Sequence, residues 1–188
     1  MADNHDLAPI EAAGLRVVFE PRVQVASLRY FDRQGAFARL VHDVTGVTLP
    51  DCLRALSRPA DRTPEAIVLA WRSPTETLMI GAAPTLIGTL QRAATTLTDG
   101  CIVDQSGGAL VFRARGEAVA ELFTRLGGQG AGPAIGESRR TRLADVAVLV
   151  AKVHPEETLL IVERCYAPHL IGAIRISAAD LSIPSFGR

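Results

Sequence analysis

One pattern of apolar and polar positions recurs three times along this chain. Each copy has an apolar strand, a tight turn, a second strand and then an amphipathic helix, and the copies span 66–97, 101–126 and 141–176. Each unit leaves an apolar face that it cannot bury alone, so helices are expected to pack on an antiparallel or mixed sheet. The pattern therefore predicts an α+β domain built from repeated β-hairpin–helix units.

The first unit has the clearest signals. An apolar strand at 66–72 contains the single tryptophan, Trp71, and a turn at 73–76 leads into a second strand at 77–80. Pro84 suits the first turn of the following helix, where its missing N–H costs no hydrogen bond. We expect Trp71 to be part of the core.

The region before the three units is less regular. Prolines and glycines interrupt residues 1–25, which are interpreted as an extension that wraps the body or docks on another molecule. A first strand is expected at 25–30, and helical spacing of apolar residues predicts a helix over 35–44. Gly46 is well placed to end that helix. The stretch 49–64, with three prolines, is predicted to be the longest loop.

These boundaries divide the chain into three parts. Residues 1–25 form an N-terminal extension, 26–180 a single α+β domain, and 181–188 a C-terminal tail too short to make its own core. The glycine-rich stretch at 127–138 is interpreted as a flexible connection. We therefore expect the domain to consist of two half-units joined there.

Composition excludes several classes of function. The 188 residues are 48% hydrophobic, and twenty basic residues balance twenty acidic ones, which disfavours binding to nucleic acid or an anionic membrane surface. No stretch approaches the roughly 18 apolar residues of a membrane span. Cys52, Cys101 and Cys165 are widely spaced and form no Cys-x-x-Cys pair, so neither a disulfide framework nor a zinc site is indicated. A reducing cytoplasm is the expected compartment.

Several side chains of types that can act in catalysis also have an ordinary structural explanation. Asp104 and Ser106 lie close together at a predicted turn, where such side chains commonly bond nearby backbone N–H groups. Cys165 and His169 form the one cysteine–histidine pair that can share a helical face, but buried cysteine usually packs as a small hydrophobe. His154 has no partner at metal-ligand spacing. We predict no catalytic, cofactor-binding or metal site.

Two further segments resemble ligand-binding motifs. The stretch 127–130 is rich in glycine but follows a predicted helix and lacks the lysine of a P-loop, so it is interpreted as a linker. Arg139, Arg140 and Arg142 precede a long apolar strand. They fit either a site for a phosphate or a partner's acidic patch, or a solvated strand entry.

Three segments of the chain form recognisable motifs: AWRSPTETLMI at 70–80, VDQS at 103–106 with GEA at 116–118, and LLIVERCYA at 159–167. Together they resemble the sarcosine oxidase gamma subunit family of the glycine-cleavage T-protein superfamily. Segment 70–80 (AWRSPTETLMI) is similar to the family's W-x-x-P-x-E-W-L-L strand-turn-strand, and 159–167 (LLIVERCYA) to its E-L-x-V-x-R-S-F-A segment. VDQS at 103–106, followed by GEA at 116–118, is similar to the superfamily's D-x-S … G-x-x-A. Thr77 and Cys165 depart from the family, which often has tryptophan and usually serine there.

This resemblance implies a folate-binding, T-protein-like domain that acts as a non-catalytic, structural subunit of a heterotetrameric sarcosine oxidase. Such a chain carries no cofactor of its own. The oxidative demethylation of sarcosine would use FAD, FMN, NAD and tetrahydrofolate held by partner subunits, with alpha, beta and delta chains as partners. The alternatives are a small folate-binding protein of the same fold and a homo-oligomer in which a second copy covers the partner surface.

Overall fold

The computed structural model describes residues 7–58, 67–81 and 83–181, which form an α+β structure with antiparallel strand pairing. The helices are α1 Ala36–Thr45, α2 Pro84–Ala94, α3 Val119–Gly127 and α4 Ala167–Leu181, with a short 3₁₀ helix, η2, at Arg164–Tyr166. The strands are β1 Ile10–Ala12, β2 Leu15–Phe19, β3 Val25–Tyr30, β4 Ala55–Arg58, β5 Ile67–Ser73, β6 Glu76–Ile80, β7 Gly100–Asp104, β8 Ala109–Arg115, β9 Glu137–Leu143, β10 Val146–His154 and β11 Glu157–Glu163.

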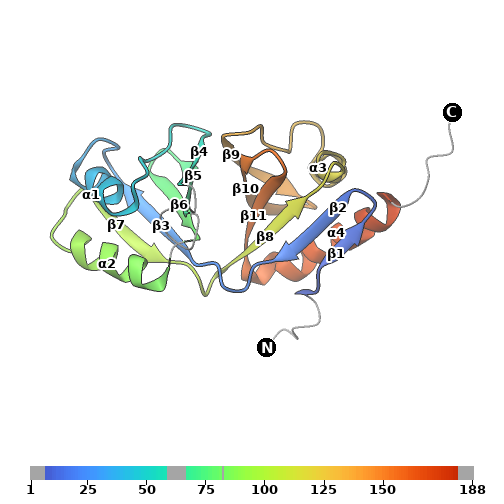
Figure 1. Ribbon diagram of the computed structural model, residues 1–188, viewed down its shortest axis with the longest axis horizontal. Coiled ribbons are helices and arrows are strands. Elements are labelled where there is room, and N and C mark those ends of the chain that lie inside the picture. The colour runs from blue at the N-terminus through green and yellow to red at the C-terminus, as the bar shows by residue number, and fades with distance from the viewer. Residues whose placement is uncertain (1–6, 59–66, 82, 182–188) are drawn as a thin grey trace.

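The described strands form two sheets. One sheet has six strands in the order β1-β2-β8-β11-β10-β9, and the other has five in the order β4-β5-β6-β3-β7. Helices α3 and α4 share a core with the six-stranded sheet, while α1 and α2 share one with the five-stranded sheet. Figure 1 shows the two halves side by side, with the sheets facing each other and the helices outside.

A third core lies between the sheets. Val25, Leu78 and Ile80 of the five-stranded sheet pack here with Leu149 and Ile161 of the six-stranded sheet, and all five side chains are at most 5% exposed. The strands β5, β10 and β11 are buried on both faces, which explains their continuous apolar sequence. The layers thus run helix, sheet, sheet, helix.

The edge strands β4 and β9 also join the two halves. The backbone N–H of Ala55 donates to the carbonyl of Gly136 at 3.0 Å, and the N–H of Ser138 donates to the carbonyl of Leu53 at 3.0 Å. The fully buried Ser138 hydroxyl lies within hydrogen-bond distance of two carbonyl oxygens, that of Arg54 at 2.9 Å and that of Trp71 at 2.8 Å. These bonds satisfy edge groups that would otherwise be left open.

Several expected elements are confirmed. The first strand is β3, and the expected helix at 35–44 is α1, whose C-terminal Gly46 has the left-handed φ of 73°. Pro84 opens α2 as expected. Trp71 is only half-buried, because it lies near the end of β5, beyond the buried run at 67–70.

The second expected hairpin, 101–126, is wrong. Strand β7 pairs with β3 in the five-stranded sheet, whereas β8 pairs with β2 and β11 in the other. The glycines at 107 and 108 therefore allow the chain to cross between sheets instead of returning along the same one. The third unit is confirmed, because β10 and β11 form a hairpin that is followed by α4. Strand β9 pairs with β10 and extends this hairpin to a three-stranded meander.

Residues 7–25 differ from the expected extension, and residues 1–6 lie outside the described residues. Strands β1 and β2 form a hairpin around Gly14, whose φ is 67°, and β2 pairs with β8 inside the six-stranded sheet. Leu15 and Val17 are buried there. The apolar alternation in β2 covers too few residues for a strand period to be recognised. The strand that pairs with β2, β8, lies about a hundred residues away in sequence.

The connection between the halves also lies elsewhere than expected. The chain crosses at 20–24 and again at 105–108, and Figure 1 shows both crossings at the lower edge of the molecule, between the two halves. Segment 127–138 instead joins α3 to β9, and both of these elements belong to the half with the six-stranded sheet. The expected loop at 49–64 contains β4. Its residues 59–64 and the tail at 182–188 lie outside the described residues.

Candidate functional site

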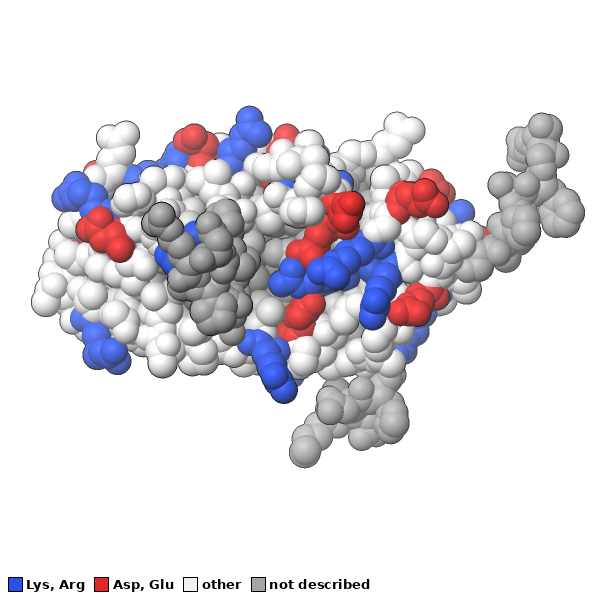
Figure 2. All heavy atoms as spheres, viewed as in Figure 1, with Lys and Arg blue, Asp and Glu red and all other residues white. Residues whose placement is uncertain are grey.

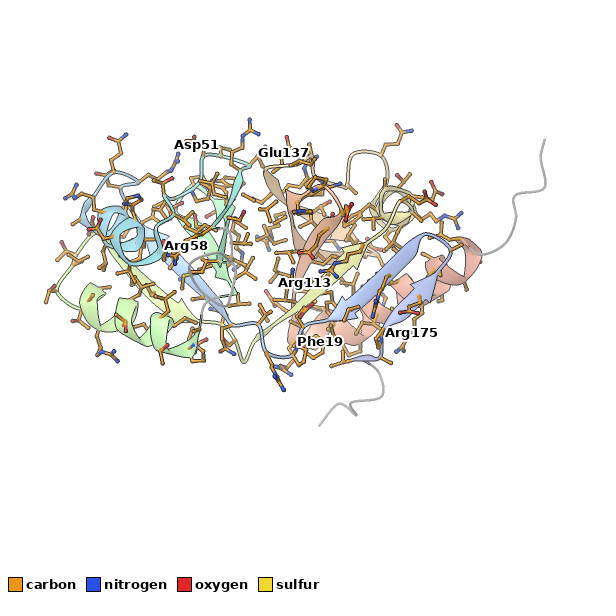
Figure 3. The ribbon with its side chains drawn as sticks, in the orientation of Figure 1. Phe19, Asp51, Arg58, Arg113, Glu137 and Arg175 are labelled. Atoms are coloured by element: carbon orange, nitrogen blue, oxygen red, sulfur yellow. The ribbon has the colours of Figure 1, made fainter. Side chains whose placement is uncertain are left out.

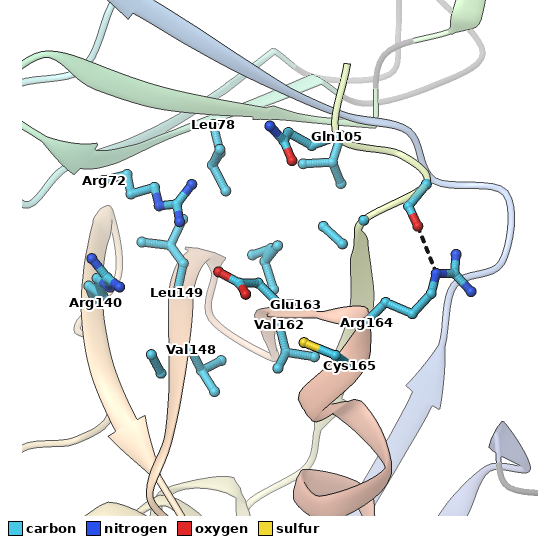
Figure 4. Close-up of a pocket in the computed structure, with 16 residues that line it drawn as sticks. Arg72, Leu78, Gln105, Arg140, Val148, Leu149, Val162, Glu163, Arg164 and Cys165 are labelled. Atoms are coloured by element: carbon cyan, nitrogen blue, oxygen red, sulfur yellow. Dashed lines mark hydrogen bonds between the residues drawn. The ribbon is translucent and has the colours of Figure 1, made fainter. Parts of the chain in front are cut away.

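A cavity opens between the two sheets beside the crossing segment 105–108 (Figure 4). Its volume is about 540 Å³, which lies within the ~300–1,000 Å³ range of small-molecule pockets. We call it the junction cavity. Its polar lining residues are Arg72, Gln105, Arg140, Glu163, Arg164 and Cys165.

Apolar side chains of both sheets form the walls of the junction cavity. Val25 and Leu78 come from the five-stranded sheet, and Leu149 and Ile161 come from the six-stranded sheet. These side chains belong to the core between the sheets, so the cavity is where that core opens toward solvent. Apolar walls combined with a limited number of polar groups are typical of a binding pocket.

Arg72 is held in place beside the cavity by a network around Glu76. Its Nη1 donates to Glu76 Oε1 at 3.1 Å, and the same oxygen accepts the hydroxyl of Ser27 at 2.6 Å. Ser27 is fully buried, and the side chains of Arg72 and Glu76 are 27% and 15% exposed. Partial burial strengthens such charge-assisted bonds, so this network fixes the guanidinium at the cavity wall.

The three arginines expected at 139–142 have different surroundings. Arg139 pairs with Glu137 at 2.8 Å, and Arg142 donates to the backbone carbonyl of Asp145 at 2.6 Å. Arg140 is exposed, lines the junction cavity and has no side-chain hydrogen bond or ion pair within the described parts of the chain. Figure 4 shows its guanidinium at the cavity near that of Arg72.

The side chains of Asp104 and Ser106 accept hydrogen bonds from nearby backbone N–H groups, as expected. The N–H of Ser106 donates to Asp104 Oδ1 at 2.9 Å, and the Ser106 hydroxyl accepts the N–H of Val25 at 3.1 Å. Hydrogen bonding by the Ser106 side chain and then by its N–H lowers the pKa of Asp104 below the ordinary 3.8, against a smaller opposing effect of burial. The two residues therefore fasten the crossing segment to β3.

Cys165 and His169 have separate surroundings. Cys165 lies in η2 and its thiol faces the junction cavity in Figure 4, whereas His169 Nε2 lies 3.0 Å from the carbonyl oxygen of Ala144. Across residues 7–58, 67–81 and 83–181, no group of three or more His, Cys, Asp or Glu side chains is placed to hold a metal. His154 ends β10 and is exposed.

A second charged cluster lies on the face of β8 that is turned toward the other sheet, beside a cavity lined also by Val68 and Ile80. Glu157, 14% exposed, pairs with both Arg113 and Arg115, and Arg113 also pairs with Glu20 at 2.9 Å. Figure 2 shows blue and red side chains gathered in the middle of this face, where Figure 3 labels Arg113. Because opposite charges alternate here, the cluster is a stabilising network between strands.

Sequence reasoning singled out Arg140 as one of a triplet but missed Arg72 and Glu76 as a site. Their separation by four residues spans the β5–β6 turn, which places both on the inner face of the sheet. A polar pair flanking the turn of an apolar hairpin is the signal that could have indicated them.

Among the described residues, no helix is long and apolar enough to cross a membrane.

Comparison with known proteins bears on the fold. No protein-family profile matches the chain, and a comparison with curated proteins finds no significant match. Among solved structures, a chain of the heterotetrameric sarcosine oxidase from Corynebacterium sp. U-96, in complex with pyrrole 2-carboxylate, is similar over 95% of this chain and 91% of its own. Its TM-score is 0.79 at 17% sequence identity.

A second similar structure is the glycine cleavage system aminomethyltransferase T from Bartonella henselae. It has a TM-score of 0.65 at 8% identity over 84% of this chain. Only 44% of the aminomethyltransferase is covered, so this chain corresponds to less than half of that protein. The expected T-protein-like fold is confirmed: this chain has a fold shared by a chain of a heterotetrameric sarcosine oxidase and by part of an aminomethyltransferase.

Proposed function

We propose that this chain is a gamma-like subunit of a heterotetrameric sarcosine oxidase, with a structural role in assembly. The observation that carries the proposal is the match to a chain of such an oxidase along nearly the whole of both chains. Because the match covers nearly all of both chains, it favours the interpretation that this chain corresponds to a whole subunit and not to one domain of a larger enzyme. The three motifs at 70–80, 103–118 and 159–167 support the same assignment.

The proposal places the chemistry in other chains. FAD, FMN, NAD and tetrahydrofolate belong to partner subunits of alpha, beta and delta type, and the complex demethylates sarcosine oxidatively. The complex is proposed to work in the cytoplasm, which is supported by three exposed cysteines, Cys52, Cys101 and Cys165, none in a disulfide.

Co-expression tests this role directly. The alpha, beta and delta chains of the same host are produced with and without this chain, and size-exclusion profiles are recorded together with flavin absorbance. We expect a single flavin-containing peak that includes this chain, and a smaller or aggregated species without it. An oxidase of unchanged size and sarcosine turnover in the absence of this chain would contradict the proposal.

The junction cavity supports one alternative, a folate-binding protein of the same fold. Its volume, about 540 Å³, and its apolar walls suit a small aromatic ligand. Calorimetric titration of the purified chain with tetrahydrofolate separates the two functions. Binding at micromolar affinity would favour the alternative, while no heat of binding together with assembly into the oxidase supports the subunit role.

A further inference from the structure

Two cavities on the same side of the molecule are joined by one carboxylate. The junction cavity has Arg72 in its wall, and a second cavity of about 480 Å³ has Arg29, Phe31 and Glu76 in its wall. Glu76 Oε1 lies 3.1 Å from Arg72 Nη1 and 3.9 Å from Arg29 Nε, so it connects the two. We call the combined feature the arginine surface. Its charged members are Arg29, Arg72, Glu76, Arg140, Glu163 and Arg164, and its exposed aromatic member is Phe31.

The arginine surface carries an excess of positive charge. Four arginines and two glutamates line the two cavities. Glu76 is already engaged, because it accepts the Ser27 hydroxyl at 2.6 Å and faces both Arg29 and Arg72. One carboxylate therefore balances two guanidinium groups. Arg140 adds a further cation with no ion pair among the residues described.

Phe31 gives the same surface an exposed aromatic side chain. It follows the end of β3 and is 87% exposed, while its neighbour Tyr30 is 2% exposed and bonds to Thr77 at 2.9 Å. Leaving a phenyl ring in water forgoes the free energy that its burial would provide. Exposed aromatic side chains beside arginines have the composition of interface hot spots.

A second copy of this chain is a poor occupant. Two-fold symmetry sets the same patch of both copies against each other, and each patch carries four arginines against two glutamates, so two patches of like net charge would face each other. Like charges brought together in this way oppose association. The surface instead fits a partner that brings negative charge together with an apolar contact for Phe31.

We propose that the arginine surface is the docking site for a partner subunit, and that this partner sets a carboxylate against Arg72 and Arg140 and an apolar pocket around Phe31. The inference rests on the proposed subunit function. Its physical basis is complementarity: the partner's carboxylate supplies the missing negative charge, and its pocket removes the phenyl ring from water.

Matched substitutions test the inference. Arg140→Glu reverses the unpaired cation, and Arg142→Glu makes the same change two residues along β9, where the side chain engages Asp145 outside the cavity. Phe31→Ala removes the exposed ring, and Ile176→Ala removes another exposed apolar side chain, 69% exposed on α4. The affinity of each variant for the co-expressed flavin-containing subunits is measured by biolayer interferometry at two salt concentrations.

We expect Arg140→Glu and Phe31→Ala to weaken binding at least tenfold, and the two control variants to stay within about threefold of wild type. Raising the salt concentration is expected to weaken wild type more than Arg140→Glu, because that variant has lost an electrostatic contact. Arg140→Lys keeps the charge and is expected to recover part of the affinity. Thermal melting of each variant establishes that it is folded.

The outcomes separate the inference from the proposed function. Wild type that binds the flavin-containing subunits, with Arg140→Glu and Phe31→Ala binding equally well, would overturn the docking site and leave the subunit role intact. Wild type that binds no such subunits would overturn the subunit role and the docking site with it. A homodimer disrupted by the same two substitutions would overturn the inference in favour of a second copy.

Discussion

The contact between β7 and α1 makes a quantitative prediction for Gly100→Ala. A Cβ atom at Gly100 would lie 2.3 Å from Phe37 Cγ and 2.8 Å from the carbonyl oxygen of Arg29. Carbon atoms in optimal contact are about 3.5–4.0 Å apart, so the ring or the strand has to move by about 1 Å. Phe37 is fully buried in the core under α1, and little free space is expected there for such a shift.

The shift also disturbs the start of α1. The carboxylate of Asp99, directly before Gly100, accepts the N–H of Phe37 at 3.0 Å. Overpacking of this kind costs ~1–3 kcal/mol, and weakening the Asp99 hydrogen bond at the start of α1 costs ~1 kcal/mol, while alanine recovers up to ~1 kcal/mol of glycine's conformational entropy. The net loss is about 2 kcal/mol, which corresponds to a melting temperature lower by ~4–8 °C in a chain of this size.

Circular dichroism melting of Gly100→Ala measures this effect, with Gly172→Ala as the control. Gly172 lies within α4, and an added Cβ there meets no atom within 4 Å. The control is expected to raise the melting temperature by ~1–4 °C, because alanine favours the helix by ~0.5–1 kcal/mol. A Gly100→Ala variant that melts at or above wild type would refute the described packing of Phe37 against β7.

Three further substitutions test other parts of the structure. Glu157→Gln, which weakens two arginine pairs at a mostly buried carboxylate, is expected to lower the urea midpoint by an amount equivalent to ~1–2 kcal/mol; an unchanged midpoint would mean that solvent screens these pairs. Since Ser106 lowers the pKa of Asp104 in the folded state, the stability from that carboxylate is present above the unfolded pKa near 3.8 and is lost as pH falls through the folded pKa. Asp104→Asn is therefore expected to be less stable than wild type at pH 7, with a difference that closes below pH 3.8, and a pH-independent difference in melting curves would contradict this. Tyr30→Phe removes a buried bond to Thr77 and is expected to cost ~1 kcal/mol in denaturant unfolding, whereas an equal stability would argue that the bond does not form.

Local signals predicted the elements that they encode directly. The helix α1 follows from its apolar spacing and from Gly46, and α2 follows from Pro84 and its apolar stripe. These signals act within a few residues, so they can be recognised without knowing what lies elsewhere in the chain. The strand β3 was predicted for the same reason.

Strand pairing was much less predictable. A turn of glycines at 107 and 108 is compatible with a hairpin and with a crossing between sheets, and the difference depends on β2, which pairs with β8 from a distant part of the chain. The short strands β1 and β2 carry too few residues for a visible period. The chain therefore connects the two halves at 20–24 and 105–108. The amino-acid composition of these two segments does not distinguish them from ordinary loops within one half.

The candidate site was predictable only in part. The triplet at 139–142 was recognised as a possible binding feature, but its spacing did not reveal that Arg140 alone faces the junction cavity. Arg29, Phe31 and Glu76 come together because β3 and β6 are neighbours in the sheet. Such proximity is a property of the fold, and a sequence shows it only after the pairing of strands is known.

The central claim, that this chain is a subunit of a flavin-containing oxidase, is tested most directly by native mass spectrometry of the tagged chain purified from its own host. The account predicts one complex that contains this chain together with flavin-bearing partner chains, and a visible absorption spectrum of bound flavin. A colourless species composed of this chain alone, from cells with measurable sarcosine oxidase activity, would contradict it.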